Sequence, residues 1–593
     1  MVALTTNPDL SLGNVRPGVY IAVNLEAPGG GVDDINRRLL IMAYKRAIGT
    51  RPPNTPFQVT AQQDADDGCG RGSDAARGYA AAMTQIGAGN VDAYICPLNE
   101  PAGGASTYNL IFSGVATAAG SVDVSICGQP IVTVGIAIGD DAPTVAAGVQ
   151  GAIAQLLDIP VSSSLNGATV TLTYIHVGDV GEDLPVRVTF NQGAGISCSP
   201  GSIAFGGAAS GAGTTRLVIG GTTITTLVND GDTPDAVTAN VVAEINAGGY
   251  PVTAAVDATT PTQVDLFFAP DRDMRRFTVE IDTTSGLTAD TSSGGVIGFG
   301  QPVLTAALSN LAALPGFAGW AVPFVGRQDT PDVGTLGGIA AHVESNADGV
   351  NMKGQKVHAC VTWPVAIAGT LPVGTAPALT SSPRYTILWC QDAGVQGWEL
   401  AARVAAARVA NDYPAQNWDG YALKAGLTTP LVLPAPASRP DSPTINSAMR
   451  SYYLCPLRVD EASNTLVIEK GTTTSNSSYQ PLRDFATIDQ VDFWRPSMVT
   501  RLQQKFGAVS AKRYSAPKTP NTISINAITD EMYFQALDWD DEDLYDGAMA
   551  LKNGFQAAFN KTNPTRIDAS FPMSPVINVH QIGVIGNLVS PSS

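Results

Sequence analysis

An internal repeat constrains the fold of this chain more than any other feature of its sequence. Residues 121–190 begin "SVDVSICGQPIVTVGIAIGDDAPTV", and residues 214–281 begin "TTRLVIGGTTITTLVNDGDTPDAV". Gly139-Asp140 matches Gly231-Asp232, and Pro160-Val161 matches Pro251-Val252. In each copy, runs rich in β-branched residues flank a stretch with a helical apolar face, which predicts a hairpin, one helix and further strands. Two copies are too few for a solenoid, so the repeat predicts two related modules.

The sequence on either side of the repeats has a different pattern. Before them, "RRLLIMAYK" and "VDAYICPL" are apolar runs typical of buried strands, separated by a helix that Ser73 or Asp74 caps. After them, "GWAVPFV", "KVHACVTW" and "RYTILWC" predict further buried strands, and "GWELAARVAAARVAND" predicts an Ala-rich helix. A strand–helix–strand order indicates parallel strands joined by helical crossovers. The repeats are therefore expected to be an insertion that splits one α/β domain.

The C-terminal part of the chain predicts a mixed α+β region. Apolar residues alternate over Thr465–Glu469, as in a half-buried strand. A helix follows whose apolar face includes Met498 and Leu502. A second helix is expected over about Thr529–Trp539, with Thr529 as its N-cap.

The length of the chain, 593 residues, is too great for one hydrophobic core. The expected fold class is α/β and α+β multidomain: a split α/β sandwich core, a C-terminal α+β domain, two inserted β-rich repeat modules, and extended N- and C-terminal arms. The expected divisions are an N-terminal arm (1–30), the two parts of the α/β domain (31–106 and 303–440), the two inserted modules (107–205 and 206–302), a C-terminal core domain (441–575) and a C-terminal arm (576–593).

Charge and composition exclude several classes of protein. The formal net charge of −18 argues against a surface for nucleic acid or for an anionic membrane. The first residues lack the basic and apolar regions of a signal peptide, and no apolar run reaches the ~18 residues of a membrane span. The 7 cysteines are scattered with no close pair, which favours free thiols in a reducing cytoplasm.

A search for catalytic and ligand-binding motifs is negative. Gly349–Gly354 has the glycine spacing of a phosphate loop, but Gln355 follows where Lys and Ser or Thr are needed. The 4 histidines lack metal-ligand spacing, and no G-x-S-x-G motif is present. The carboxylate-rich run Asp538–Asp546 lacks the glycine and closing glutamate of an EF-hand, so a solvated or partner-facing acidic surface is preferred to a calcium site. The sequence therefore predicts no catalytic residue, no cofactor site and no metal site.

Several motifs resemble the contractile tail sheath proteins of Mu-type bacteriophages. They are "RPGVY" near the N-terminus, "RRLLIMAYKRAIGT" with "GRGS" after it, and the ending "FNKTNPTRIDASFPMSPVINVHQIGVIGNLV". The resemblance covers both ends and the split α/β domain, and less specifically the repeats. One departure is "DGCG", where the family tends to have an aromatic–glycine pair before "RGS".

The resemblance implies a structural subunit rather than an enzyme. Such subunits stack as hexameric rings around a tail tube, and contraction drives the tube through the host envelope. The partners implied are further copies of the chain, the tail tube protein, and baseplate and tail terminator proteins, with no nucleic acid and no membrane. The implied location is the contractile tail of a virion, after assembly in the host cytoplasm. Two other classes stay open: a virion-associated or secreted polysaccharide hydrolase, and a surface adhesin.

The resemblance also implies two sets of contact residues. Arms of neighbouring subunits add strands to one another's core sheet, and the strand-forming residues at the two ends of this chain are Val19, Tyr20, Ile21, Val23, Ile577, Val579, Ile582, Val584 and Ile585. The acidic residues Asp540, Asp541 and Asp543 are expected to face the tail tube through charge.

Overall fold

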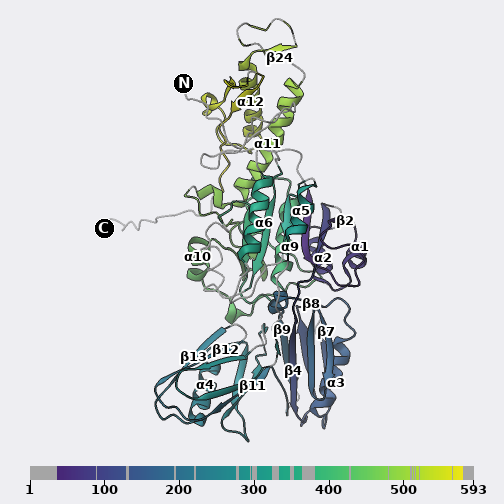
Figure 1. The fold of residues 1–593 in the computed structure, drawn as a ribbon, viewed down its shortest axis with the longest axis vertical. Helices are drawn as coiled ribbons and strands as arrows, with labels where there is room; N and C mark the ends of the chain where they lie inside the picture. Colours follow the sequence, from purple (N-terminus) through teal and green to yellow (C-terminus); the bar gives the residue numbers. More distant parts are fainter. Residues whose placement is uncertain are drawn as a thin grey trace, which may run out of the picture.

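The computed structural model of the chain describes residues 37–578. Within this span the description omits residues 88–89, 129–131, 193–194, 220–221, 271, 276–278, 294, 297–302, 315, 323–332, 348–352, 363–380, 427–428, 479, 508–509, 512, 514–515, 518, 520 and 564. Figure 1 shows an elongated molecule with a helical end at the top, an α/β body in the middle and two β-rich units at the bottom.

The body is built on an eight-stranded sheet with the strand order β2-β3-β1-β19-β20-β21-β22-β23. Neighbouring strands from β3 to β22 are parallel, and the two outermost strands, β2 and β23, are antiparallel to their neighbours. The strands are β1 (Arg38–Tyr44), β2 (Phe57–Val59), β3 (Asp92–Leu98), β19 (Gly319–Ala321), β20 (Lys356–Val361), β21 (Tyr385–Trp389), β22 (Cys455–Asp460) and β23 (Thr465–Ile468).

Helices cover both faces of this sheet. On β1, Leu39 and Ile41 pack with residues of α1 (Gln62–Cys69), α2 (Asp74–Ile86) and α9 (Gly397–Ala410). The alternate residues of β1 pack on the other face with α5 (Thr305–Ala312) and α6 (Val333–Asn346). A parallel strand buried on both faces needs apolar residues at every position, which explains the continuous run "RLLIMAY". The α/β class predicted from the sequence is confirmed.

Apart from one short 3-10 helix, η1 in the first repeat, the two repeats have the same order of elements. The first repeat (residues 105–199) contains β4 (Ala105–Gly114), β5 (Gly120–Ile126), β6 (Val132–Ile136), α3 (Ala142–Ile153), β7 (Val161–Asn166), β8 (Thr169–Val177), η1 (Asp179–Asp183), β9 (Val186–Gln192) and β10 (Ile196–Ser199). The second repeat (residues 201–293) contains β11 (Gly201–Gly206), β12 (Gly213–Ile219), β13 (Thr222–Val228), α4 (Pro234–Ala247), β14 (Val252–Val256), β15 (Gln263–Phe268), β16 (Val279–Thr283) and β17 (Thr288–Ser293).

Each repeat forms two sheets. The first repeat has the orders β6-β5-β9 and β10-β4-β8-β7, and the second has β13-β12-β16 and β14-β15-β11-β17. The boundary between the modules that the sequence predicts, between residues 205 and 206, falls inside β11. This strand pairs with β15 and β17 of the second repeat. The short strand β18 (Gly295–Val296) returns to pair with β4, so the chain leaves and re-enters this region side by side. This pairing gives the repeats the geometry of an insertion.

The C-terminal region packs around its own aromatic cluster. It contains α11 (Phe485–Phe506), β24 (Ser510–Ala511), β25 (Thr522–Ile523), α12 (Ile525–Asp541), β26 (Gln556–Phe559) and β27 (Ile567–Ser570). Helix α10 (Ser442–Ser451) packs instead with the core of the body through Ala448. Trp494 of α11 and Trp539 of α12 lie at the centre of the cluster with Tyr545. Their burial joins the two helices into one unit.

Two local predictions are wrong. Helix α12 begins at Ile525 after Ser524 rather than at Thr529, because Ile528 packs on the aromatic cluster and extends the helix by one turn. The segment "DGCG" before α2 is expected from its glycines to be a turn, but Asp67 to Cys69 form the last turn of α1. That helix is polar except for a few buried positions, so it leaves no apolar periodicity in the sequence.

Candidate functional site

The carboxyl edge of the sheet is where open parallel α/β proteins bind ligands, at the point where the strand order reverses. Here the order reverses between β1 and β19. The first repeat lies against this edge, below the body in Figure 1. The ring of His176, on β8, is 5.7 Å from the ring of Tyr44, the last residue of β1. The first repeat thus covers the edge that an enzyme of this class would use.

His176 is held by hydrogen bonds at both ring nitrogens. The backbone N–H of Asp74 donates to Nε2 over 3.2 Å, so the ring proton is on Nδ1, which donates to Glu100 Oε1 at 2.7 Å. The hydroxyl of Tyr174 donates to Asp74 Oδ1 at 2.7 Å. Burial raises the pKa of Asp74, and the hydrogen bond from Tyr174 partly offsets this. This histidine, isolated in the sequence, joins β8 to the N-terminus of α2.

Arg77 and Glu399 form a buried ion pair between α2 and α9. Their side chains are 6% and 3% exposed. Arg77 also donates to Gln396 Oε1 at 3.0 Å and lies over the ring of Trp398. Burying two charges is costly unless both are fully satisfied. This pair therefore fixes the packing of α2 against α9, next to the first repeat.

Arg275 joins the second repeat to the first repeat and to the body. It precedes β16 and is buried, and its guanidinium donates to the backbone oxygen (2.6 Å) and the carboxylate of Asp183 in the first repeat. It also donates to the carbonyls of Ala393 and Val395, just before α9. Asp183 in turn accepts from Thr362 and from the N–H of Gly397. One arginine therefore connects three parts of the chain.

Replacing Arg275 by Ala should loosen this junction. The change leaves the buried carbonyls and Asp183 without their main donor, at a cost of about 2–4 kcal/mol in unfolding free energy. Hydrogen exchange should rise at residues 393–397 and around Asp183, while Arg216→Ala, on an exposed position of β12, should change neither. Unchanged exchange in the Arg275 variant would show that the junction does not depend on this side chain.

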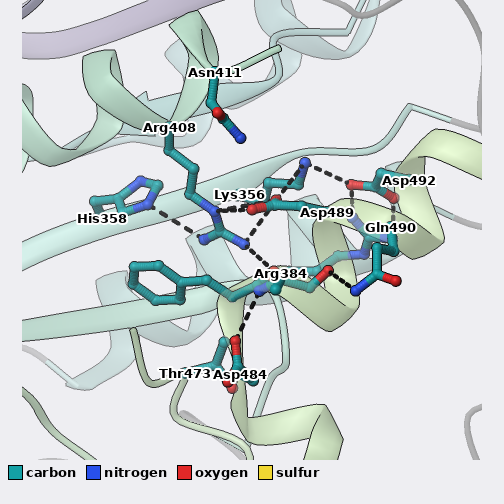
Figure 2. A network of polar contacts seen from close by, with 12 residues as sticks. Lys356, His358, Arg384, Arg408, Asn411, Thr473, Asp484, Asp489, Gln490 and Asp492 are labelled. Carbon is teal, nitrogen blue, oxygen red and sulfur yellow. Dashed lines mark hydrogen bonds and ion pairs between the residues drawn. The ribbon is translucent and has the colours of Figure 1, made fainter. Parts of the chain in front are cut away.

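The amino edge of the same sheet is joined to α11 by a second buried network (Figure 2). Arg384, just before β21, makes two bonds to the carboxylate of Asp492, at 2.7 and 2.6 Å. Arg408 of α9 binds Asp489, one turn earlier on α11. Lys356, the first residue of β20, lies between the two carboxylates, 3.0 Å from Asp489 and 3.2 Å from Asp492.

The charges of this network stabilise one another. Burial opposes ionisation of both carboxyls, but Arg408 and Lys356 lower the pKa of Asp489, and Arg384 and Lys356 lower the pKa of Asp492. Burial and the neighbouring Arg408 lower the pKa of His358 to about 3. His358 is therefore neutral: its Nδ1 donates to the carbonyl of Trp320, and its Nε2 faces Arg408.

His358→Gln should flatten the pH dependence of stability. The folded chain keeps His358 neutral down to about pH 3, whereas the unfolded chain binds a proton below pH ~6.5. Between these values the unfolded state binds more protons, so stability falls as the pH is lowered, by up to about 1.4 kcal/mol per pH unit for one proton. Urea titrations at pH 6.5, 5.5 and 4.5 measure this slope. His342→Gln is the comparison. Burial also lowers the pKa of His342, but this residue is only half-buried, so its replacement should flatten the slope less than His358→Gln does. Equal slopes in His358→Gln and the unaltered chain would contradict the assignment.

The acidic run at the end of α12 has two kinds of carboxylate. Asp540 accepts from the backbone N–H groups of Gly547 and Ala548, at 3.1 and 3.0 Å, and so fixes the turn after the helix. Asp541 and Asp543 are exposed. Asp543 has a φ of 56°. Two of the three residues expected to face a partner are therefore exposed at the surface, and one has a structural role.

The segment leading to the C-terminal arm is fixed to α11. Gln490 donates to the carbonyl of Val576 and accepts from its N–H, at 3.0 and 2.8 Å. The next residue, Ile577, is 60% exposed. The other predicted arm residues lie outside the described part of the chain: Val19, Tyr20, Ile21, Val23, Val579, Ile582, Val584 and Ile585.

In the described ranges, no group of three or more His, Cys, Asp or Glu side chains is placed to hold a metal ion. None of the helices that the structure describes is long and apolar enough to cross a membrane. The sequence analysis predicted neither the buried polar contacts at the carboxyl edge of the sheet nor the network at its amino edge. The trace that they leave in the sequence is the presence of Lys, Arg and His beside fully buried strands.

A comparison with known proteins gives one informative match. The chain is 29% identical over 180 residues to the tail sheath protein of the Mu-like prophage FluMu of Haemophilus influenzae. The aligned segment covers 30% of this chain and 36% of that protein. No family model matches the chain. A homologue of this chain is thus a phage tail sheath protein, which confirms the resemblance drawn from its motifs.

Solved structures give weaker matches. The sheath tail protein of Listeria innocua superposes with a TM-score of 0.41 and 9% identity, covering 93% of this chain and 94% of that one. The flagellar cap protein FliD of Helicobacter pylori gives a TM-score of 0.12 and 9% identity, over 31% and 55% of the two chains. Because TM-scores this low do not establish a common fold, the homology rests on the sequence match.

Proposed function

We propose that this chain is the sheath subunit of a contractile phage tail. It stacks as hexameric rings around the tail tube, and contraction of the assembly drives the tube through the host envelope. The observation that carries this proposal is the sequence match to a tail sheath protein. Such a protein is a structural component of a tail, so its location is the virion and its function is not catalysis.

The architecture supports a structural role. The carboxyl edge of the sheet is covered by the first repeat through His176 and Tyr174, and the amino edge is joined to α11 through Arg384 and Asp492. Buried polar contacts at both edges connect the repeats, the body and the C-terminal region. A subunit with these connections transmits force as one unit, which a contracting lattice requires.

We propose that the arms link neighbouring subunits by strand addition, with Val19–Val23 and residues 577–593 as the donated segments. The two-stranded sheet of β26 and β27 is a suitable acceptor, because two strands alone are marginally stable and both of its edges are open among the described strands. The proposed organisation is a split α/β domain, two inserted modules, a C-terminal core and two arms. It differs from the expected divisions in that β22 and β23, within the expected range 441–575, belong to the sheet of the α/β domain.

Asp541 and Asp543 are proposed to contact the tail tube. The double variant Asp541→Asn, Asp543→Asn should lower tube-dependent assembly most at low salt, because each exposed charge contributes only ~0–1 kcal/mol but is repeated around every ring. The difference from the unaltered chain should shrink as salt is raised, because salt screens the contact of the unaltered chain. Co-sedimentation with tube protein over a salt series measures this. Asp540 is left intact because it fixes the following turn, and Asp230→Asn, at an exposed position of the second repeat, is the control for lost charge. An identical salt profile would place the tube contact elsewhere.

Sedimentation of the purified chain tests the proposal. A sheath subunit should form polymers that pellet and that contain no other component, and the preparation should hydrolyse neither ATP, peptide nor glycan. A monomer at all concentrations and salts, or turnover removed by one carboxylate or serine substitution, would overturn it.

A further inference from the structure

Several edge strands of the repeats lack the features that normally protect such strands, and two of these, β13 and β7, also carry an exposed leucine. Strand β13 ends the sheet β13-β12-β16, and β7 ends the sheet β10-β4-β8-β7. An edge strand exposes unpaired backbone N–H and C=O groups, and proteins usually block it with lysine, proline or a bulge. The sequences TTITTLV of β13 and VSSSLN of β7 contain no charge and no proline. Both strands pair with their inner neighbours in regular register, without a bulge.

Each of these strands also carries an exposed leucine. Leu227 on β13 is 74% exposed, and Leu165 on β7 is 42% exposed. In the part of the chain that the structure describes, no strand pairs with the outer edge of either β13 or β7. Each edge thus offers unpaired backbone groups beside an exposed aliphatic side chain. Such an edge can bind an extended strand of another chain.

The charge of the repeats favours contact between copies through uncharged edge strands. Residues 102–302 contain 18 Asp and Glu, 5 Arg and no Lys. Two copies of this region therefore repel each other over most of their surface. The uncharged strands β7 and β13 are places where two copies can approach without that repulsion.

The two strands face opposite directions. Figure 1 shows β13 at the left side of the repeats, and β7 with α3 at the right side. When two different, compatible surfaces lie on opposite sides of one molecule, copies associate head to tail and close into a ring or extend as a helix.

We propose that β13 of one copy pairs edge to edge with β7 of the next copy. The pairing joins the repeats of neighbouring subunits into a continuous band of β-structure, separate from the contacts made by the arms and the C-terminal region. It rests on the proposed function, because it needs a polymer of this chain.

Cross-linking between introduced cysteines tests the pairing directly. All seven native cysteines are buried, so cysteines at positions 165 and 227 are the accessible thiols. Polymers of the double variant Leu165→Cys, Leu227→Cys, treated with a short bismaleimide, should give a series of covalent dimers, trimers and longer species. Each single variant should give none.

Three results would overturn the proposal. They are well-formed polymers of the double variant that give no covalent series, dimers from Leu227→Cys alone, and capture of a different segment by position 227. Failure of the unaltered chain to polymerise would instead overturn the proposed function, and the pairing with it.

A charge-exchange experiment covers the case in which the cysteine variant does not assemble. Thr225→Lys and Ser164→Lys each place a charge on one of the two edges, and each should lower the polymerised fraction about threefold or more. Combining Thr225→Lys with Ser164→Asp should restore most of it. Ala258→Lys, in an exposed turn of the second repeat, should have no effect. A loss with the control equal to that of the edge variants, or no rescue by the opposite charge, would contradict the pairing.

Discussion

Asp492→Ala should destabilise the chain by about 3–5 kcal/mol, because it removes one partner of a buried ion pair and leaves the other without its counter-charge. Asp492 holds Arg384 through two hydrogen bonds and shares Lys356 with Asp489. Its side chain is only 9% exposed, and that of Arg384 is 6% exposed. The contacts that are lost lie at the junction between the sheet and α11. We therefore expect the variant to lose assembly as well as stability.

The control for this variant is Glu461→Ala. Glu461 pairs with Arg439, but its side chain is 75% exposed, so its removal should cost at most ~1 kcal/mol. Urea unfolding followed by tryptophan fluorescence gives both values. Because the pKa of Asp492 is lowered in the folded chain, its contribution is present at neutral pH and is lost as the pH falls below ~4. The Ala variant should therefore lose less stability than the unaltered chain on acidification below pH 4. Similar values for the Asp492 and Glu461 variants at pH 7 would contradict the buried network.

Deleting residues 577–593 should abolish polymer formation and leave the fold intact. The cut falls after Val576, which keeps the hydrogen bonds between Val576 and Gln490. Each donated strand contributes about 0.5–1.5 kcal/mol per backbone hydrogen bond, less the cost of ordering the segment. One link is weak, but every subunit in a lattice both donates and receives, so removing all links together removes the assembly.

A variant in which residues 577–593 are replaced by a Gly/Ser sequence of equal length separates strand pairing from chain length. It should remain monomeric like the deletion, with the circular dichroism and thermal midpoint of the unaltered chain. Normal polymers from either variant would show that this segment is not a link. A loss of fold in both would show that it belongs to the core of its own subunit.

The sequence predicts the elements of this fold better than its junctions. Strand β1 is recognisable because both of its faces are buried, and the two repeats are recognisable because α3 and α4 interrupt runs of β-branched residues in the same order. Helix α1 is missed because it buries few residues, and α12 is predicted one turn too late because Thr529 with two acidic residues after it resembles a helix start.

The polar networks that position the parts were not predictable from motifs. Arg384 and Asp492 are 108 residues apart in the chain, and Arg275 and Val395 are 120 apart. Sequence periodicity reports only neighbours within one element, so it cannot show which distant charges meet. A partial signal exists: Asp489 and Asp492 lie three residues apart on α11, and both side chains are buried although they lie on a helix with an apolar face.

Electron microscopy of the purified full-length chain tests the central claim most directly. We expect rings and tubes built from this chain alone, with sixfold symmetry in end views. Tubes should be absent from the deletion of residues 577–593 prepared in parallel. Monodisperse single particles of the unaltered chain under conditions that polymerise sheath proteins, or closed assemblies without a central channel for a tube, would contradict the claim.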